Sequence, residues 1–92
     1  MKFDWDGEKS RTNQDKHEID FETTKNLWLD EGRIEIYAPH PIEHRRIIIA
    51  RYHNKLWAAV YTMRDDTIRI ISVRRARKRE VNLYEKEKTG NR

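Results

Sequence analysis

The chain has 92 residues, enough for one domain with a small core and too few for two. Charged residues make up 39% and hydrophobic residues 36%, but three Trp, four Tyr and several Ile-rich stretches supply core material, which argues against a disordered chain. The absence of cysteine excludes a disulfide framework and a thiolate metal site, and no apolar run is long enough for a signal sequence or a membrane span, so we expect a cytoplasmic protein.

The positive charge lies in the second half of the chain. Residues 1–43 carry six Lys/Arg and eleven Asp/Glu, a net charge of −5, whereas residues 44–92 carry fourteen and five, a net charge of +9. A basic half of this kind predicts an anionic partner and favours nucleic acid.

The first elements are expected to be a short edge strand over Lys2–Trp5 and a helix over Gly7–His17 that Asp6 caps. This helix has no large apolar residue, so residues on either side must hold it in place. One of its faces carries Lys9, Asn13, Lys16 and His17, which makes it either a solvated polar face or a binding face.

A second helix is predicted over Phe21–Leu29 with Asp20 as its N-cap. Short turns, at His53-Asn54 and at Arg64-Asp65-Asp66, then separate consecutive apolar segments, which indicates antiparallel pairing. We therefore predict an α+β domain over residues 1–88 with a frayed tail at 89–92, in which two N-terminal helices and one C-terminal helix pack on an antiparallel sheet of about four strands, to which the N-terminal strand can be added. The four strands are Arg33–Tyr37, Arg46–Tyr52, Leu56–Thr62 and Thr67–Arg74.

The corner between the last strand and the last helix is the most basic segment. Five of its six residues are cationic, namely Arg74, Arg75, Arg77, Lys78 and Arg79, and it is either a solvated helix face or a phosphate-binding corner. On a helical projection Ala76, Glu80, Leu83 and Glu87 share one face, with Tyr84 at its edge. A carboxylate on an inward face needs a cationic partner, and Arg69 and Arg46 are candidates.

Other chemistry finds little support. The four histidines lack the spacing of metal ligands, and neither a Gly-rich phosphate loop nor a Gly-x-Ser-x-Gly elbow occurs, so we expect no metal and no cofactor.

The sequence resembles the BrnT family of toxins over nearly its whole length. The opening segment matches in Phe3-x-Trp5-Asp6, Lys9, Asn13, Lys16-His17 and Phe21-Glu22, and the later segment in Arg46, Val60-Tyr61-Thr62-x-Arg64, Arg69-Ile70-Ile71-Ser72-x-Arg74-x-Ala76, Glu80 and Tyr84. The chain departs from the family pattern at Glu18 and Arg51, where Gly is usual, at Asp20, where Ser is usual, and at Thr24, where Ala is common.

The resemblance implies a RelE-like fold and the toxic half of a type II toxin–antitoxin pair, which cuts RNA and arrests translation. It also implies a BrnA-type ribbon-helix-helix antitoxin, a heterotetramer with two copies of each protein, and binding to operator DNA through the antitoxin.

For a ribonuclease that uses no metal, we expect the ribose 2′-OH to attack the adjacent phosphate, which requires a base, an acid and cations. The family motifs then point to His17, Lys16, Glu80 and Tyr84 for proton transfer and to Arg46, Arg69 and Arg74 for phosphate and transition-state charge. Further RNA contacts are expected from Lys9, Asn13, Arg64, Arg75, Arg77, Lys78 and Arg79.

A different function stays open at this level. The basic half could grip nucleic acid without cutting it, or the protein could act only as an antitoxin-binding co-repressor. Histidine is the side chain best suited to proton transfer near neutral pH, but His17 could equally fasten the first helix to the sheet.

Overall fold

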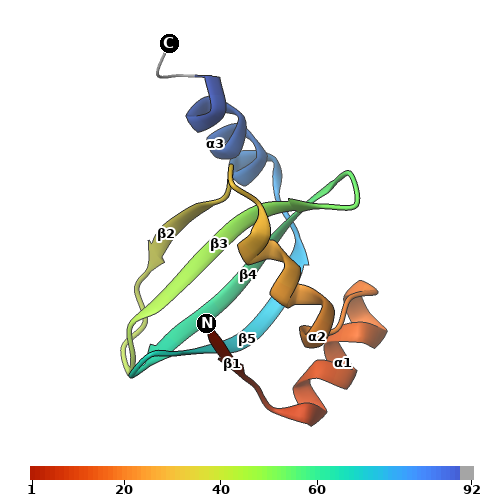
Figure 1. Ribbon diagram of the computed structural model, residues 1–92, viewed down its shortest axis with the longest axis vertical. Helices are drawn as coiled ribbons and strands as arrows, with labels where there is room; N and C mark the ends of the chain where they lie inside the picture. Colours follow the sequence, from red (N-terminus) through yellow and green to blue (C-terminus); the bar gives the residue numbers. More distant parts are fainter. Residues whose placement is uncertain (90–92) are drawn as a thin grey trace.

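The computed structural model describes residues 1–89 and contains a curved five-stranded sheet with the strand order β1-β5-β4-β3-β2 (Figure 1). The elements along the chain are β1 (Lys2–Asp4), α1 (Gly7–His17), α2 (Phe21–Thr24), the 3-10 helix η1 (Lys25–Leu29), β2 (Ile34–Ala38), β3 (Arg45–Tyr52), β4 (Lys55–Arg64), β5 (Thr67–Arg75) and α3 (Lys78–Thr89). The α+β class is therefore confirmed. The tail predicted at 89–92 lies, apart from Thr89, outside the described residues.

The sheet is mixed, which corrects the predicted antiparallel sheet of four strands. Strands β2 to β5 do pair antiparallel, but β1 lies parallel to β5, with Phe3 opposite Ile68. This pairing brings together segments from the two ends of the domain. No local turn marks such a pairing in the sequence, so only its edge position could be anticipated.

The two hairpin turns form where turn residues were predicted. His53 and Asn54 join β3 to β4 with φ of 51° and 64°, the left-handed conformation that a two-residue type I′ hairpin requires. Asp65 has φ of 58° in the turn between β4 and β5.

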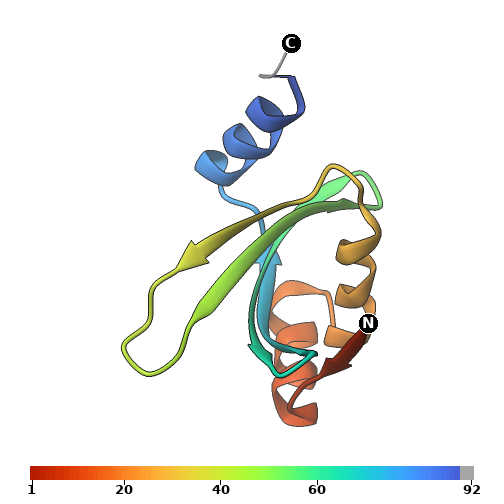
Figure 2. The same cartoon turned by 60° about the vertical axis from the view of Figure 1, so that its left-hand side comes forward.

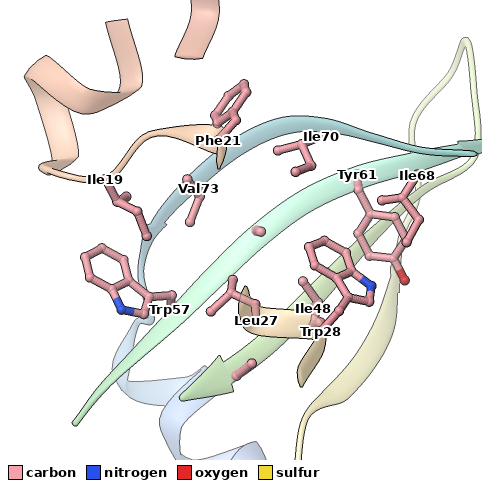
Figure 3. Close-up of a cluster of buried hydrophobic side chains, with 12 residues drawn as sticks. Ile19, Phe21, Leu27, Trp28, Ile48, Trp57, Tyr61, Ile68, Ile70 and Val73 are labelled. Carbon is pink, nitrogen blue, oxygen red and sulfur yellow. The ribbon is translucent and has the colours of Figure 1, made fainter. Parts of the chain in front are cut away.

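The helices α1, α2 and η1 cover one face of the sheet, and the main core lies beneath them (Figure 3). Trp28 from η1 is at its centre, where its ring meets Phe3 and Tyr61 edge to face at centroid distances of 5.1 and 5.2 Å. This contact fastens β1 and η1 to the middle of the sheet.

The second predicted helix has two parts. Asp20 caps it as expected, with its Oδ1 accepting from the Thr23 N–H at 2.8 Å, but the α-helical geometry ends at Thr24 and continues as η1. The Thr24 hydroxyl donates to the Asp20 carbonyl at 2.7 Å, a side-chain bond that competes with regular helical pairing.

The opposite face of the sheet carries a smaller core beneath the first turns of α3, while the rest of α3 extends away from the sheet (Figure 2). Tyr84 is buried there against Ile49, Leu56 and Ala58. The inward side of α3 differs from the predicted one, because Leu83 and Glu87 are exposed and the buried residues are Glu80 and Tyr84. The projection missed this because only one end of α3 meets the sheet.

Candidate active site

A groove of about 440 Å³ lies beside the C-terminal end of α1, where α1 runs along the edge of β5. We call it the α1 groove. Four cationic side chains and one histidine line it. Its lining residues are Lys16, His17, Glu18, Lys55, Trp57, Arg74 and Arg75.

Asn13 positions the end of α1 at this edge. Its side-chain Nδ2 donates to the carbonyls of Val73 at 2.8 Å and Ile19 at 2.9 Å, and its Oδ1 accepts from the Val73 N–H at 3.1 Å. Strand β1 pairs with β5 only as far as Arg69, so Val73 has no strand neighbour on that side. The Asn13 amide takes that strand's place, which puts Lys16 and His17 one turn further along α1 at the rim of the groove.

Helix α1 ends in a left-handed C-cap. Glu18 has φ of 63° and its N–H donates to the Gln14 carbonyl at 2.9 Å, a left-handed cap that ordinarily favours glycine. The resemblance noted in the sequence leads to an expectation of Gly at this position, and glycine would adopt this φ without steric cost. Lys16 and His17 lie in the last turn, where cationic groups are stabilised by the helix dipole.

Arg74 is held in place by Glu80 at the start of α3. Nη1 donates to Glu80 Oε1 at 2.8 Å and Nη2 donates to Oε2 at 2.9 Å, a two-pronged ion pair that is mostly buried. Glu80 Oε1 also accepts from the Arg77 N–H at 2.8 Å, as in a capping box, so the same carboxylate begins the helix and orients the guanidinium.

These contacts shift both pKa values. The Arg74 hydrogen bonds lower the pKa of Glu80 below its ordinary value despite the opposing effect of burial, and the same bonds raise the pKa of Arg74. Glu80 is therefore a bound carboxylate that fixes a cation, rather than a free acid.

One edge of the Arg74 guanidinium remains available. Of its five N–H groups, two bind Glu80 and one donates to the Arg75 carbonyl at 3.3 Å. Within residues 1–89, Nε–H and the second Nη2–H have no acceptor. These two donors form a side-on fork whose geometry matches two phosphate oxygens.

Two lining residues were missed by the sequence analysis. Trp57 faces Arg75 across the β4–β5 pair, and the Arg75 guanidinium lies 5.6 Å from the centre of the Trp57 ring. Lys55 begins β4 beside them. Only the register of the strands brings these residues to the end of α1, and register is not visible in local sequence.

The structure does not bring the three predicted arginines together. Arg69 lies on the same strand face as Arg74 but five residues away, about 16 Å at the rise of a β-strand. It donates to Asp4 Oδ2 at 2.7 Å and lines a smaller hollow of about 110 Å³ with Lys9 and Arg64. We call this hollow the β5 groove.

Arg46 lies on the other face of the sheet. It is paired with Tyr61, whose ring belongs to the main core, and its positive charge lowers the pKa of the Tyr61 hydroxyl. Burial and the hydrogen bond that the Tyr61 hydroxyl donates to Glu35 outweigh this effect and raise the Tyr61 pKa. The sheet thus separates Arg46 from Arg69 and Arg74, which were expected to act together on the phosphate.

Comparison with known proteins identifies the family. The family described as the ribonuclease toxin, BrnT, of type II toxin–antitoxin systems matches residues 5–80 of the 92. The chain belongs to the BrnT family. No curated protein matches the chain. Membership makes the protein a ribonuclease toxin of a type II system, whose partner is a protein antitoxin.

Two residues expected at the site of this BrnT toxin are used by the fold instead. Asn13 is 6% exposed and both of its amide groups are engaged, so it is not available for the predicted RNA contact. Tyr84 is 2% exposed and donates to Asp30 Oδ2 at 2.8 Å on the far side of the sheet from the main core. Burial raises its pKa, and the bond to Asp30 adds to that shift, so the arrangement does not support a proton-transfer role.

The remaining basic residues of the corner, Arg77, Lys78 and Arg79, are exposed at the start of α3 and line none of the grooves described above. In the part of the chain that the structure describes, no cluster of His, Asp and Glu could hold a metal ion. No helix within residues 1–89 is long and apolar enough to cross a membrane.

Proposed function

We propose that this toxin is a metal-independent endoribonuclease and that the α1 groove is its active site. The observation that carries the proposal is the Arg74 guanidinium, which Glu80 fixes in place and which keeps a free two-donor edge beside Lys16 and His17. A fixed fork of this kind can stabilise charge on a phosphate without rearranging during the reaction.

In the proposed reaction the ribose 2′ oxygen attacks the adjacent phosphorus, and the bond from phosphorus to the 5′ oxygen breaks. His17 accepts the 2′ proton, and Lys16 donates a proton to the leaving 5′ oxygen. Arg74, together with Arg75 and Lys55, stabilises the extra negative charge of the transition state. The products are a 2′,3′-cyclic phosphate and a 5′-hydroxyl end.

The β5 groove is proposed to guide the RNA beyond the cleaved bond. Arg69, Arg64 and Lys9 would bind backbone phosphates there, and Arg77, Lys78 and Arg79 would add exposed positive charge at the start of α3. Arg69 is then an RNA-binding residue rather than a catalytic one.

The first test is RNA cleavage by the purified protein in the presence of a chelator, with Arg74→Ala, Arg74→Lys and His17→Ala. Removal of the Arg74 fork is expected to lower the cleavage rate by about 10²–10³-fold, and Arg74→Lys should recover little because lysine cannot donate a planar fork. Loss of His17 is expected to cost about 10²–10⁴-fold.

The matched control is Arg11→Ala. Arg11 is exposed on α1 and forms an ion pair only with Glu8 among the described residues. The substitution removes the same charge as Arg74→Ala but outside the grooves, so the cleavage rate should stay unchanged. Full activity of Arg74→Ala would refute the site, and an inactive wild-type protein that binds RNA would favour the non-catalytic alternative.

We further propose that the cleavage arrests translation in the cytoplasm, that the fold is RelE-like and that the antitoxin is of the BrnA ribbon-helix-helix type in a complex with two copies of each chain. Family membership supports an antitoxin partner, and the α+β fold with a mixed sheet is compatible with a RelE-like fold. Co-purification with the product of the adjacent reading frame, followed by native mass measurement, is the direct check.

A further inference from the structure

A second hollow, of about 430 Å³, lies at the end of the sheet where β2 passes into β3. Its lining residues are Tyr37, Glu43, His44, Arg46, Thr62, Met63 and Arg64. In Figure 1 the loop between β2 and β3 is at the end of the sheet opposite α3. We call this cavity the β2–β3 hollow.

An unusually exposed aromatic pair borders this hollow. Tyr37 is 66% exposed, and its ring lies nearly parallel to that of His44, with an interplanar angle of 20° and a centroid distance of 6.2 Å. A smaller hollow of about 200 Å³ borders the same pair and is also lined by Pro39 and Arg45. Both rings therefore line two hollows, and the Tyr37 side chain is largely exposed.

The charges around the pair favour an anionic ligand. Among the residues that the structure describes, neither Arg46 nor Arg64 forms an ion pair with a carboxylate, and Glu43 is already paired with Arg45 at 3.1 Å. Accessible aromatic rings beside unpaired cations are the combination by which proteins bind single-stranded RNA, because rings stack on bases and cations bind the backbone.

We propose that the β2–β3 hollow is an RNA subsite in which Tyr37, supported by His44, stacks on an unpaired base while Arg46 and Arg64 bind the flanking phosphates. This inference rests on the proposed ribonuclease function. Along β4, Trp57 of the α1 groove and Met63 of the hollow are six residues apart, about 20 Å. The subsite would therefore hold a base several nucleotides from the cleaved bond and would select unpaired RNA there.

The test uses a fluorescent RNA oligonucleotide with 2′-O-methyl groups, which binds but cannot be cut, and anisotropy measurements on the full chain. Tyr37→Ala is expected to weaken binding by about 5- to 100-fold, the range for loss of one stacked base, whereas Tyr37→Phe should bind like wild type. Leu29→Ala, which removes another exposed apolar side chain, is the matched control and should change nothing.

An abasic site scanned along the same oligonucleotide separates stacking from a general loss of binding. One abasic position should weaken wild-type binding as much as Tyr37→Ala does, and the two changes together should cost no more than either alone. Additive losses, or unchanged affinity of Tyr37→Ala, would overturn the proposal. The proposal would also be overturned if Tyr37→Ala bound the antitoxin more weakly than wild type but bound RNA equally well. The surface would then be a protein-binding one.

Cleavage of a dinucleotide distinguishes this inference from the proposed function. A dinucleotide reaches only the α1 groove, so Tyr37→Ala should cut it at the wild-type rate while Arg74→Ala does not. If the wild-type protein neither binds nor cuts RNA, both proposals fail. If it cuts RNA but Tyr37→Ala binds a long oligonucleotide normally, only the subsite fails.

Discussion

At the scale of single residues, Asn13 shows how one side chain can replace a strand. Its amide satisfies both backbone groups of Val73 at a point where β5 has no strand neighbour on that side. Because α1 has no large apolar residue, this polar contact has the anchoring role that a hydrophobic face has in most surface helices. The position of Lys16 and His17 depends on it.

We therefore expect Asn13→Ala to lower the free energy of unfolding by about 1–3 kcal/mol, because the buried N–H and carbonyl of Val73 lose their partners. Urea denaturation measures the change. Thr12→Ala on the exposed side of the same helix is the control and should shift the free energy of unfolding by only a few tenths of a kcal/mol. Equal effects of the two substitutions would contradict the anchoring role.

At the scale of elements, α3 is fastened to the sheet by two carboxylates. Glu80 binds Arg74 and the Arg77 N–H in the first turn, and Tyr84 donates to Asp30, which also accepts from the backbone N–H groups of Gly32 and Arg51. Burial opposes ionisation of Asp30, but these hydrogen bonds outweigh it and lower its pKa. The ion pair at Glu80 thus serves both the helix and the proposed active site.

The Glu80 contact predicts a dependence of stability on pH. The pKa of the Glu80 carboxyl is lower in the folded state than in the unfolded state. Its contribution to the free energy of unfolding is therefore present above the unfolded pKa of about 4.3 and is lost as the pH falls through the folded pKa. Glu80→Gln should be less stable than wild type at neutral pH, and the difference in unfolding free energy should narrow on acidification. Glu87→Gln, exposed on the same helix, is the control; a constant difference between Glu80→Gln and wild type at every pH would argue against this origin.

At the scale of the whole molecule, the basic half of the chain forms the central strands and their corners. A cation from β4 lines each of the α1 groove, the β5 groove and the β2–β3 hollow, beside further cations from β3 or β5. Lys16 and Lys9 add positive charge from the otherwise acidic N-terminal half. Under the proposed function, this distribution offers an anionic strand several points of positive charge on one small domain.

RNA affinity should accordingly fall steeply with salt. We expect Arg74→Ala to reduce the slope of log affinity against log salt concentration by about 0.7, the value for one phosphate contact on a single strand. Arg11→Ala should leave the slope unchanged. Anisotropy titrations at several salt concentrations measure it, and an unaltered slope in Arg74→Ala would show that Arg74 does not contact phosphate.

The sequence by itself determined the parts of this protein that depend on neighbouring residues. The caps at Asp6 and Asp20, the turn at His53-Asn54 and the four later strands follow from local side-chain chemistry and from apolar periodicity, and the structure confirms them with small shifts in their bounds. The family could also be identified, because its motifs are ordered along the chain.

Only the tertiary structure decided which distant residues meet. The parallel pairing of β1 with β5, the strand-like role of Asn13 and the separation of Arg46 from Arg74 all depend on register and on which face of the sheet a side chain occupies. A shift of one residue moves a side chain to the other face, and nothing in the local sequence records such a shift across strands. The candidate site was therefore predictable as residue types, whereas its grouping into one groove was a property of the fold.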